Sequence, residues 1–75
     1  MTRDELRIFF TERGWNLNRT GTSYIRPDVP NTRYRVKQLA LRKEQRMGDG
    51  GWFRLSSGYI SGLTIINGKL AGMKR

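Results

Sequence analysis

The sequence predicts an α+β fold in which an N-terminal helix packs on a small antiparallel β-sheet, within a single domain spanning residues 1–75. Three observations predict it. The first thirteen residues carry apolar side chains at helical spacing, the last third is rich in aromatic and β-branched residues, and an Asn-Gly pair near the C-terminus is typical of a hairpin turn. A chain this short buries only about 60% of its unfolded surface, so its stability margin is thin, and a homodimer is one way to widen it.

The helix is predicted for residues 3–13. Thr2, followed three residues later by Glu5, matches the capping box that begins many helices. The apolar residues of the segment recur at helical spacing and form one stripe: Leu6, Phe9 and Phe10. Gly14 suits the left-handed position that ends a helix, and Trp15 follows as an expected core anchor.

The segment after the helix predicts one short strand between loops. Residues 16–23 read NLNRTGTS and consist mostly of turn-forming residues. A strand is expected over Ser23–Arg26, ended by Pro27. The following PDVPN stretch contains two prolines, which exclude a regular helix or a central strand. It is predicted to be a loop.

Residues 32–47 fit two structures. As a basic helix, this segment would begin at Asn31 or Thr32 and end at Gly48; a hairpin would follow, in a winged-helix-like arrangement, and most of its residues are good helix formers. As a long strand over residues 33–47, it would fold back through the GDGG loop onto 52–57, with a β-bulge near Gln38 where the apolar pattern changes phase. The strand supplies a partner for the sheet, and the fold predicted above adopts it.

The C-terminal third predicts further strands. Two segments, Trp52–Ser56 and Tyr59–Ile65, are enriched in aromatic and β-branched residues and are separated by a short Ser-Ser-Gly break. Asn67–Gly68 is the dipeptide that favours a two-residue turn with positive φ at both positions. That turn would place Ile65 opposite Leu70.

Residues 38–73 resemble a class of phage proteins. The order of LALRKEQRMGDGGWFRLSSGYISGLTI and, after it, NGKLAGM is similar to that of small phage-encoded proteins. The resemblance implies an N-terminal helix paired with an antiparallel sheet, and it implies no defined function.

The composition excludes several classes of protein. Without cysteine there is no disulfide framework or thiolate zinc site, and without histidine the commonest general base and metal ligand is missing. Capping, turns and charge pairing account for the six carboxylates, so we expect neither enzymatic activity nor a cofactor. No apolar run approaches the roughly 20 residues of a membrane span, and charges from Arg3 onward do not fit a signal peptide. These features predict a cytoplasmic protein that does not enter the membrane.

The charge distribution indicates a polyanionic partner. Fifteen basic residues stand against six acidic ones, giving a net charge of +9, and eleven of the fifteen are arginine, whose planar fork matches phosphate. The excess concentrates in residues 31–54, which hold seven basic and two acidic residues. The predicted nucleic-acid-binding residues are the seven cations and two aromatic residues that could stack on bases: Arg33, Arg35, Lys37, Arg42, Lys43, Arg46, Arg54, Tyr34 and Trp52.

Two functions are compatible with this pattern. The first is a small, basic, non-enzymatic protein that binds DNA or RNA through an arginine strip on the phosphates. The second is a protein-interaction module, an inhibitor or adaptor that docks on an acidic partner surface.

If residues 33–47 are a strand, Arg42 and Arg46 are expected on one face and Lys37 and Lys43 on the other. Packing in the core is the alternative role for Trp52 and its neighbour Phe53.

The N-terminal third resembles a family of RNA-cleaving toxins. The segment ELRIFFTERGWNLNRTGTSYIRPD is similar to the opening of HicA-type toxins, with Gly14–Trp15 and Gly21–Thr22 at matching positions. Ser23 and Tyr24 stand where that family places its catalytic histidine. The resemblance therefore implies a double-stranded-RNA-binding-like fold that binds RNA without cleaving it.

Overall fold

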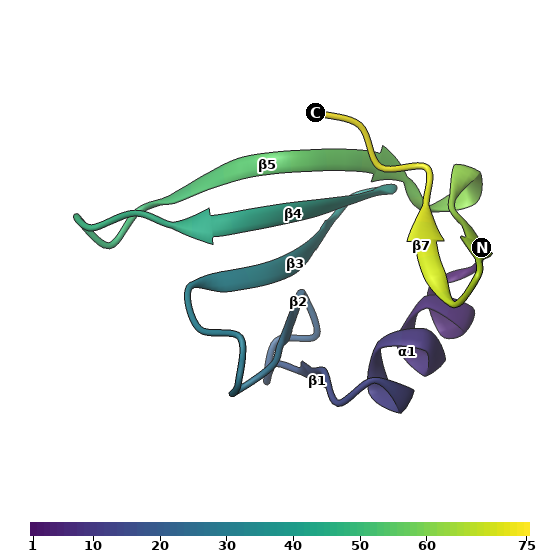
Figure 1. Cartoon of the computed structure of the whole chain (residues 1–75), viewed down its shortest axis with the longest axis horizontal. Helices are drawn as coiled ribbons and strands as arrows, with labels where there is room; N and C mark the ends of the chain where they lie inside the picture. Colours follow the sequence, from purple (N-terminus) through teal and green to yellow (C-terminus); the bar gives the residue numbers. More distant parts are fainter.

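The computed structural model describes all 75 residues and has an α+β fold with one α-helix and seven strands (Figure 1). The strands β1 to β5 form one antiparallel sheet in which each strand lies beside the next along the chain, and β6 and β7 form a separate hairpin. In chain order the elements are α1 (Arg3–Glu12), β1 (Asn16–Leu17), β2 (Ser23–Ile25), β3 (Thr32–Lys37), β4 (Ala40–Arg46), β5 (Trp52–Tyr59), the 3-10 helix η1 (Ile60–Gly62), β6 (Thr64–Ile66) and β7 (Lys69–Ala71).

The helix α1 begins where the sequence predicts, and the two features predicted to delimit it are both present. The Glu5 amide donates to Thr2 Oγ1 at 3.1 Å and the Thr2 amide donates to Glu5 Oε1 at 2.9 Å, which completes the capping box. Arg13 is the C-terminal cap, and Gly14 adopts the left-handed conformation with φ 85°. The predicted end lies one residue beyond the observed one.

The core lies between α1 and the concave side of the five-stranded sheet. Helix α1, strands β2 and β4, η1 and Leu63 just after η1 contribute to it, and Leu41 of β4 is fully buried. Its seven buried members are Leu6, Phe9, Phe10, Tyr24, Leu41, Ile60 and Leu63. Trp15 packs against this cluster as expected, whereas neither Trp52 nor Phe53 belongs to it. The alternative role in the core for these two residues was therefore wrong.

Residues 32–47 form neither a helix nor one long strand. They form the hairpin β3–β4, which turns at Gln38 and Leu39 with Val36 opposite Leu41. The turn returns Leu41 to the face of Val36, where both side chains pack in or against the core. Burial of this apolar face outweighs the helical propensity of the segment. The change of apolar phase near Gln38 therefore marks a reversal of the chain, and the bulge lies at Lys43/Glu44 instead.

The last third departs from the prediction at two points. The 3-10 helix η1 interrupts the strand predicted for Tyr59–Ile65, so that β6 begins only at Thr64. Strand β5 continues through the Ser-Ser-Gly sequence, because Ser57 is paired with Arg42 on one side and Lys74 on the other. The hairpin β6–β7 turns at Asn67–Gly68 with φ values of 53° and 75°, and Ile65 lies opposite Leu70, both as predicted. Pro27 and its neighbours form a loop, and β2 ends before it, also as predicted. The two-residue strand β1, which pairs with β2, lies in a segment that was predicted to be a loop.

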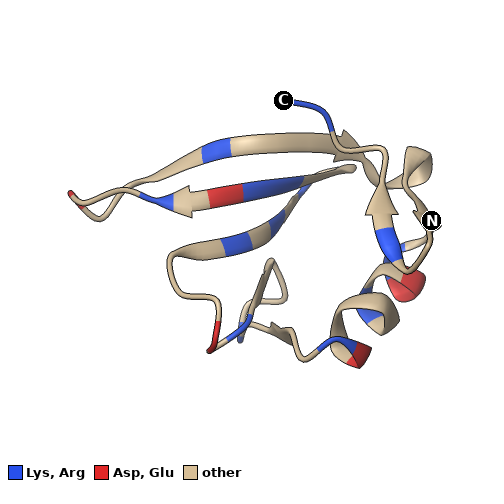
Figure 2. Ribbon diagram, viewed as in Figure 1, with Lys and Arg blue, Asp and Glu red and all other residues tan.

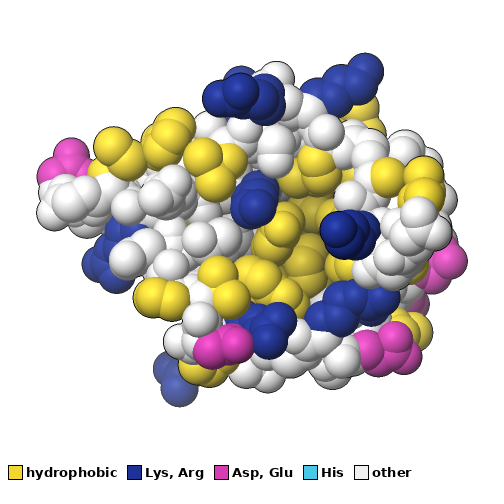
Figure 3. All heavy atoms as spheres, in the orientation of Figure 1, with side chains coloured by type: hydrophobic (Ala, Val, Ile, Leu, Met, Phe, Trp, Pro, Cys, Tyr) yellow, Lys and Arg dark blue, Asp and Glu magenta, His cyan; other side chains and the backbone are white.

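Helix α1 and the hairpin β6–β7 cover only one end of the five-stranded sheet (Figure 1). The tip of the β4–β5 hairpin extends away from them (Figure 1). In the same view, hydrophobic side chains are visible in the hollow between the sheet and α1, bordered by Lys and Arg side chains (Figure 3). The opposite face of the sheet carries no helix.

Candidate nucleic-acid interface

The strand register divides the predicted site residues between the two faces of the sheet. Residues opposite each other on antiparallel strands share a face, and successive residues alternate. Tyr34 and Leu41 point to the core, so their neighbours Arg33, Arg35 and Arg42 point to the other face. We call this other face the basic face. Its charged residues and its tryptophan are Arg33, Arg35, Lys37, Arg42, Glu44, Arg46, Arg54 and Trp52.

Seven of the nine predicted residues therefore lie on the basic face, and two do not. Lys43 and Tyr34 lie opposite each other on the helix side, where the Lys43 Nζ is 5.9 Å from the Tyr34 ring centroid and the Tyr34 ring packs against Phe10 and Trp15. Arg42 and Arg46 share a face as expected. Lys37 lies with them and not with Lys43, because the tight turn after Lys37 pairs it with Ala40.

The basic face carries a strong charge imbalance. Six cations and the single carboxylate of Glu44 give it a charge of +5, out of +9 for the whole chain. Figure 2 shows the bands of Lys and Arg along β3 and β4, with the carboxylates mostly elsewhere. Arg35 lies directly opposite Arg42, an arrangement of like charges that costs stability unless a counter-ion relieves it.

The carboxylate of Glu44 organises the centre of this face. The residue is 2% exposed, and its two oxygens face two different arginines. Arg33 Nε donates to Oε1 at 2.8 Å, whereas Arg42 Nε lies 3.4 Å from Oε2 without forming a hydrogen bond. The bulge at Lys43/Glu44 stands beside this contact. A buried charge needs such partners, because desolvation without them is costly.

Trp52 supports an arginine on the same face. The Arg33 guanidinium carbon lies 4.0 Å from the Trp52 ring centroid, and that of Arg46 lies at 5.9 Å. The ring is half-buried, and its contact with Arg33 is a cation–π interaction. Arg33 is thus fixed from two sides, by the Glu44 carboxylate and by the ring. The sequence predicted Trp52 as a ring that could stack on bases, and it gave no sign of this contact with Arg33.

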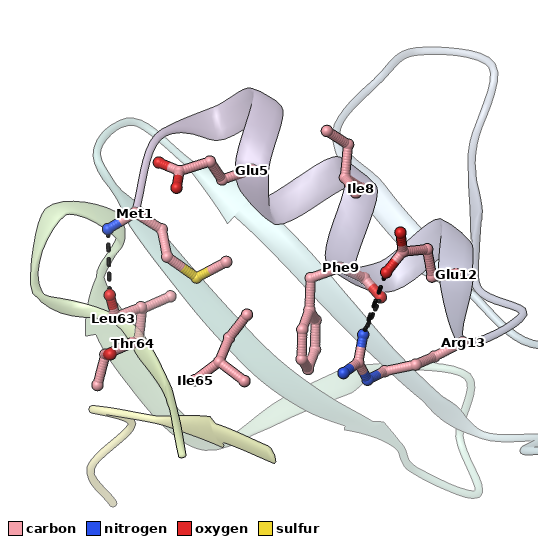
Figure 4. Close-up of a pocket in the computed structure, with 9 residues that line it drawn as sticks. All are labelled: Met1, Glu5, Ile8, Phe9, Glu12, Arg13, Leu63, Thr64 and Ile65. Carbon is pink, nitrogen blue, oxygen red and sulfur yellow. Dashed lines mark hydrogen bonds and ion pairs between the residues drawn. The ribbon is translucent and has the colours of Figure 1, made fainter. Parts of the chain in front are cut away.

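A groove on the other side of the molecule has a different character. It has a volume of about 560 Å³ between α1 and the start of β6, and apolar side chains make up much of its lining (Figure 4). Its charged groups bond within the fold: the Met1 ammonium donates to the Leu63 carbonyl at 3.1 Å and Arg13 Nη1 donates to the Phe9 carbonyl at 3.0 Å. Hydrogen bonds from the Thr2 amide and hydroxyl lower the pKa of the Glu5 carboxyl.

Two further structural findings concern metals and membranes. No three His, Cys, Asp or Glu side chains gather where they could hold a metal ion. The ten-residue α1 is the longest helix, and no helix combines the length and apolar character needed to span a membrane.

The comparisons with known proteins give no relative. The sequence matches no protein-family model, and neither the curated proteins nor the solved structures yield a match. The resemblances to phage-encoded proteins and to HicA-type toxins therefore stay predictions.

Proposed function

We propose that this chain is a non-enzymatic nucleic-acid-binding protein whose basic face contacts phosphates. One observation carries the proposal: a sheet face without a covering helix that presents six cations and a single carboxylate, which is buried. Phosphate contacts by Lys and Arg supply most of the affinity of sequence-independent nucleic-acid binding. Apart from Arg33 and Arg42, which share Glu44, no cation of this face forms an ion pair.

The spacing of these cations supports the proposal. Arg33, Arg35 and Lys37 alternate along one strand and so stand roughly 6.6 Å apart in a line. The facing strand adds Arg42 and Arg46 about one strand spacing away. Two parallel lines of cations form a surface on which a phosphate backbone can lie, and the contacts do not depend on base sequence.

The test compares the reversal of two charges on the basic face with the reversal of two charges elsewhere on the surface. The Arg35→Glu/Arg54→Glu variant removes two basic-face cations that form no ion pair. We expect weaker binding to labelled duplex DNA, single-stranded DNA or RNA, whichever the wild type prefers. The slope of log K against log salt concentration should fall by about 2, one for each lost phosphate contact. Fluorescence anisotropy between about 50 and about 200 mM salt measures both quantities.

The matched control is Arg19→Glu/Lys69→Glu. Both residues are exposed and lie off the basic face, and the variant has the same net charge of +5 (+9 less 4). It should retain most of the binding and nearly the full salt slope. Equal losses in the two variants would show that only the total charge matters. Absence of binding to all three polymers, with the protein folded, would contradict the proposal and favour an acidic protein partner.

A further inference from the structure

A basic pocket lies at the end of the basic face nearest the β3–β4 turn. It has a volume of about 740 Å³, within the range of pockets that hold small ligands. The four cations that line it are Lys37, Arg42, Arg54 and Lys74. The hydroxyl-bearing Ser57 and Tyr59 also line it. No carboxylate lines the pocket.

The chain beyond β7 builds one wall of this pocket. Lys74 pairs with Ser57 at the free edge of β5 through two backbone hydrogen bonds of 2.7 Å, which places Lys74 beside Arg42 and Arg54. Two glycines allow this close approach. A Cβ on Gly58 would lie 2.4 Å from the carbonyl oxygen of Gly72, so the C-terminal segment can pack here only if position 58 has no side chain.

The electrostatics of the pocket favour a ligand with more than one negative charge. Lys37, Arg54 and Lys74 form no ion pair, whereas Arg42 shares the single carboxylate of Glu44 with Arg33. A phosphodiester carries one negative charge, whereas a phosphate monoester carries about −1.5 to −2 at pH 7. Four cations around one cavity therefore match a terminal phosphate better than they match an internal one.

The aromatic residue at the pocket adds a second recognition element. Tyr59 is 71% exposed, although large aromatic side chains are usually at least partly covered. It lies on the same face as Arg42 and Ser57, because it pairs with Ala40. An exposed ring beside phosphate-binding cations can stack on a base, an interaction that tolerates any sequence.

We infer that this pocket binds the phosphorylated end of a nucleic-acid strand, with the terminal phosphate among the four cations and the adjacent base on Tyr59. The inference rests on the proposed function and deepens it: the rest of the basic face holds the internal phosphates, and the pocket selects the strand end. The same chemistry is present in a free nucleoside monophosphate, so the test includes both sources.

The experiment compares oligonucleotides of one sequence that carry a 5′-phosphate, a 3′-phosphate or hydroxyls at both ends. We expect one of the phosphorylated ends to bind about tenfold more tightly than the hydroxyl form, as one charge-assisted hydrogen bond would give. The ratio should fall towards one in Lys74→Gln and in Tyr59→Ser. It should persist in Lys69→Gln, which removes the same charge from an exposed position on β7.

The outcomes separate the two proposals. Binding of all three oligonucleotides with equal affinity would overturn the inference and leave the proposed function standing. Binding of none would contradict the proposed function itself. Adenosine monophosphate, titrated with adenosine as control and followed by NMR, gives the second arm. Shifts at Tyr59 and Lys74 with the monophosphate alone would support a pocket that also accepts the free nucleotide, and a strand-end preference without such shifts would restrict it to strand ends.

Discussion

At the scale of single residues, Glu44 determines how the arginines around it are held. The carboxylate is buried within the basic face, whose net charge is +5. One of its oxygens lies beside Arg33 and the other beside Arg42. The ring of Trp52 covers the Arg33 guanidinium from a second side. These contacts restrict the rotamers of the Arg33 side chain, so under the proposed function it would lose less conformational entropy on binding a phosphate. Preorganisation of this kind would favour the proposed phosphate binding without direct contact between Glu44 and the ligand.

Replacing Glu44 by Gln should lower the free energy of unfolding by about 1.5–3 kcal/mol, the contribution of hydrogen bonds to charged groups. The variant also leaves the neighbouring arginines without a counter-charge, so added salt should restore part of the loss. Urea denaturation at low and high salt measures both effects. The control Glu12→Gln removes a carboxylate that is 69% exposed and 4.0 Å from Arg13, and should change stability by less than about 1 kcal/mol. Equal stability of the two variants would contradict the role given to Glu44.

The lowered pKa of the Glu5 carboxyl leads us to expect that stability depends on pH. Its pKa is lowered from 4.5 by the hydrogen bonds from Thr2, so the folded state favours the charged form. The stabilisation is therefore present above pH 4.5 and is lost as the pH falls through the lowered pKa. Gln at position 5 keeps the capping box without the charge. The difference in melting temperature between wild type and Glu5→Gln should shrink as the pH is lowered from 6 to 3, and a constant difference would contradict the prediction.

At the scale of elements, the β3–β4 hairpin and the C-terminal segment place the site residues. The turn at Gln38 and Leu39 uses a non-glycine residue with φ 55°, an uncommon conformation that the surrounding structure must stabilise. The Arg3 guanidinium donates to the Gln38 carbonyl and so ties this turn to the start of α1. The same turn brings Lys37 to the basic face and to the pocket.

Gly58→Ala should detach the C-terminal segment from β5. The new Cβ would lie 2.4 Å from the Gly72 carbonyl oxygen, which is backbone and cannot move aside like a flexible side chain. We expect a loss of about 1–3 kcal/mol in the free energy of unfolding. Protection of the Ser57 and Lys74 amides against hydrogen exchange should fall more than elsewhere. In Gly62→Ala the Cβ has nothing within 4 Å, so this control should stay near wild type; equal protection in both variants would refute the steric argument.

At the scale of the whole molecule, most of the net positive charge lies on one face of the sheet and the apolar core lies on the other. Nine of the 75 residues are buried, so the stabilising core is small, and a net charge of +9 opposes compaction. The structure concentrates much of that charge on the face that carries no helix, away from the α1 side, where the apolar groups pack. Binding a polyanion would relieve this repulsion. Comparing the Arg35→Glu/Arg54→Glu variant with the Arg19→Glu/Lys69→Glu variant therefore tests whether the distribution of charge over the whole surface matters for binding.

Much of the fold was predictable because it depends on neighbours in sequence. The capping box, the glycine that ends α1 and the Asn67–Gly68 turn each satisfy backbone hydrogen bonds or φ values within a few residues. The two prolines excluded regular structure for a similar local reason. Most of the cationic site was also predictable, since it follows from where the charge concentrates.

The sequence by itself determined the α+β class, the helix and the basic character of residues 31–54. Only the tertiary structure decided that residues 32–47 form a hairpin, because their helical propensity gives way to the burial of Leu41 against α1. It also decided which cations share a face: a turn at Gln38 in place of a bulge moves Lys37 to the basic face and leaves Lys43 on the other. The physical reason is that one residue of register moves a side chain from one face of a sheet to the other, and register depends on contacts between distant segments.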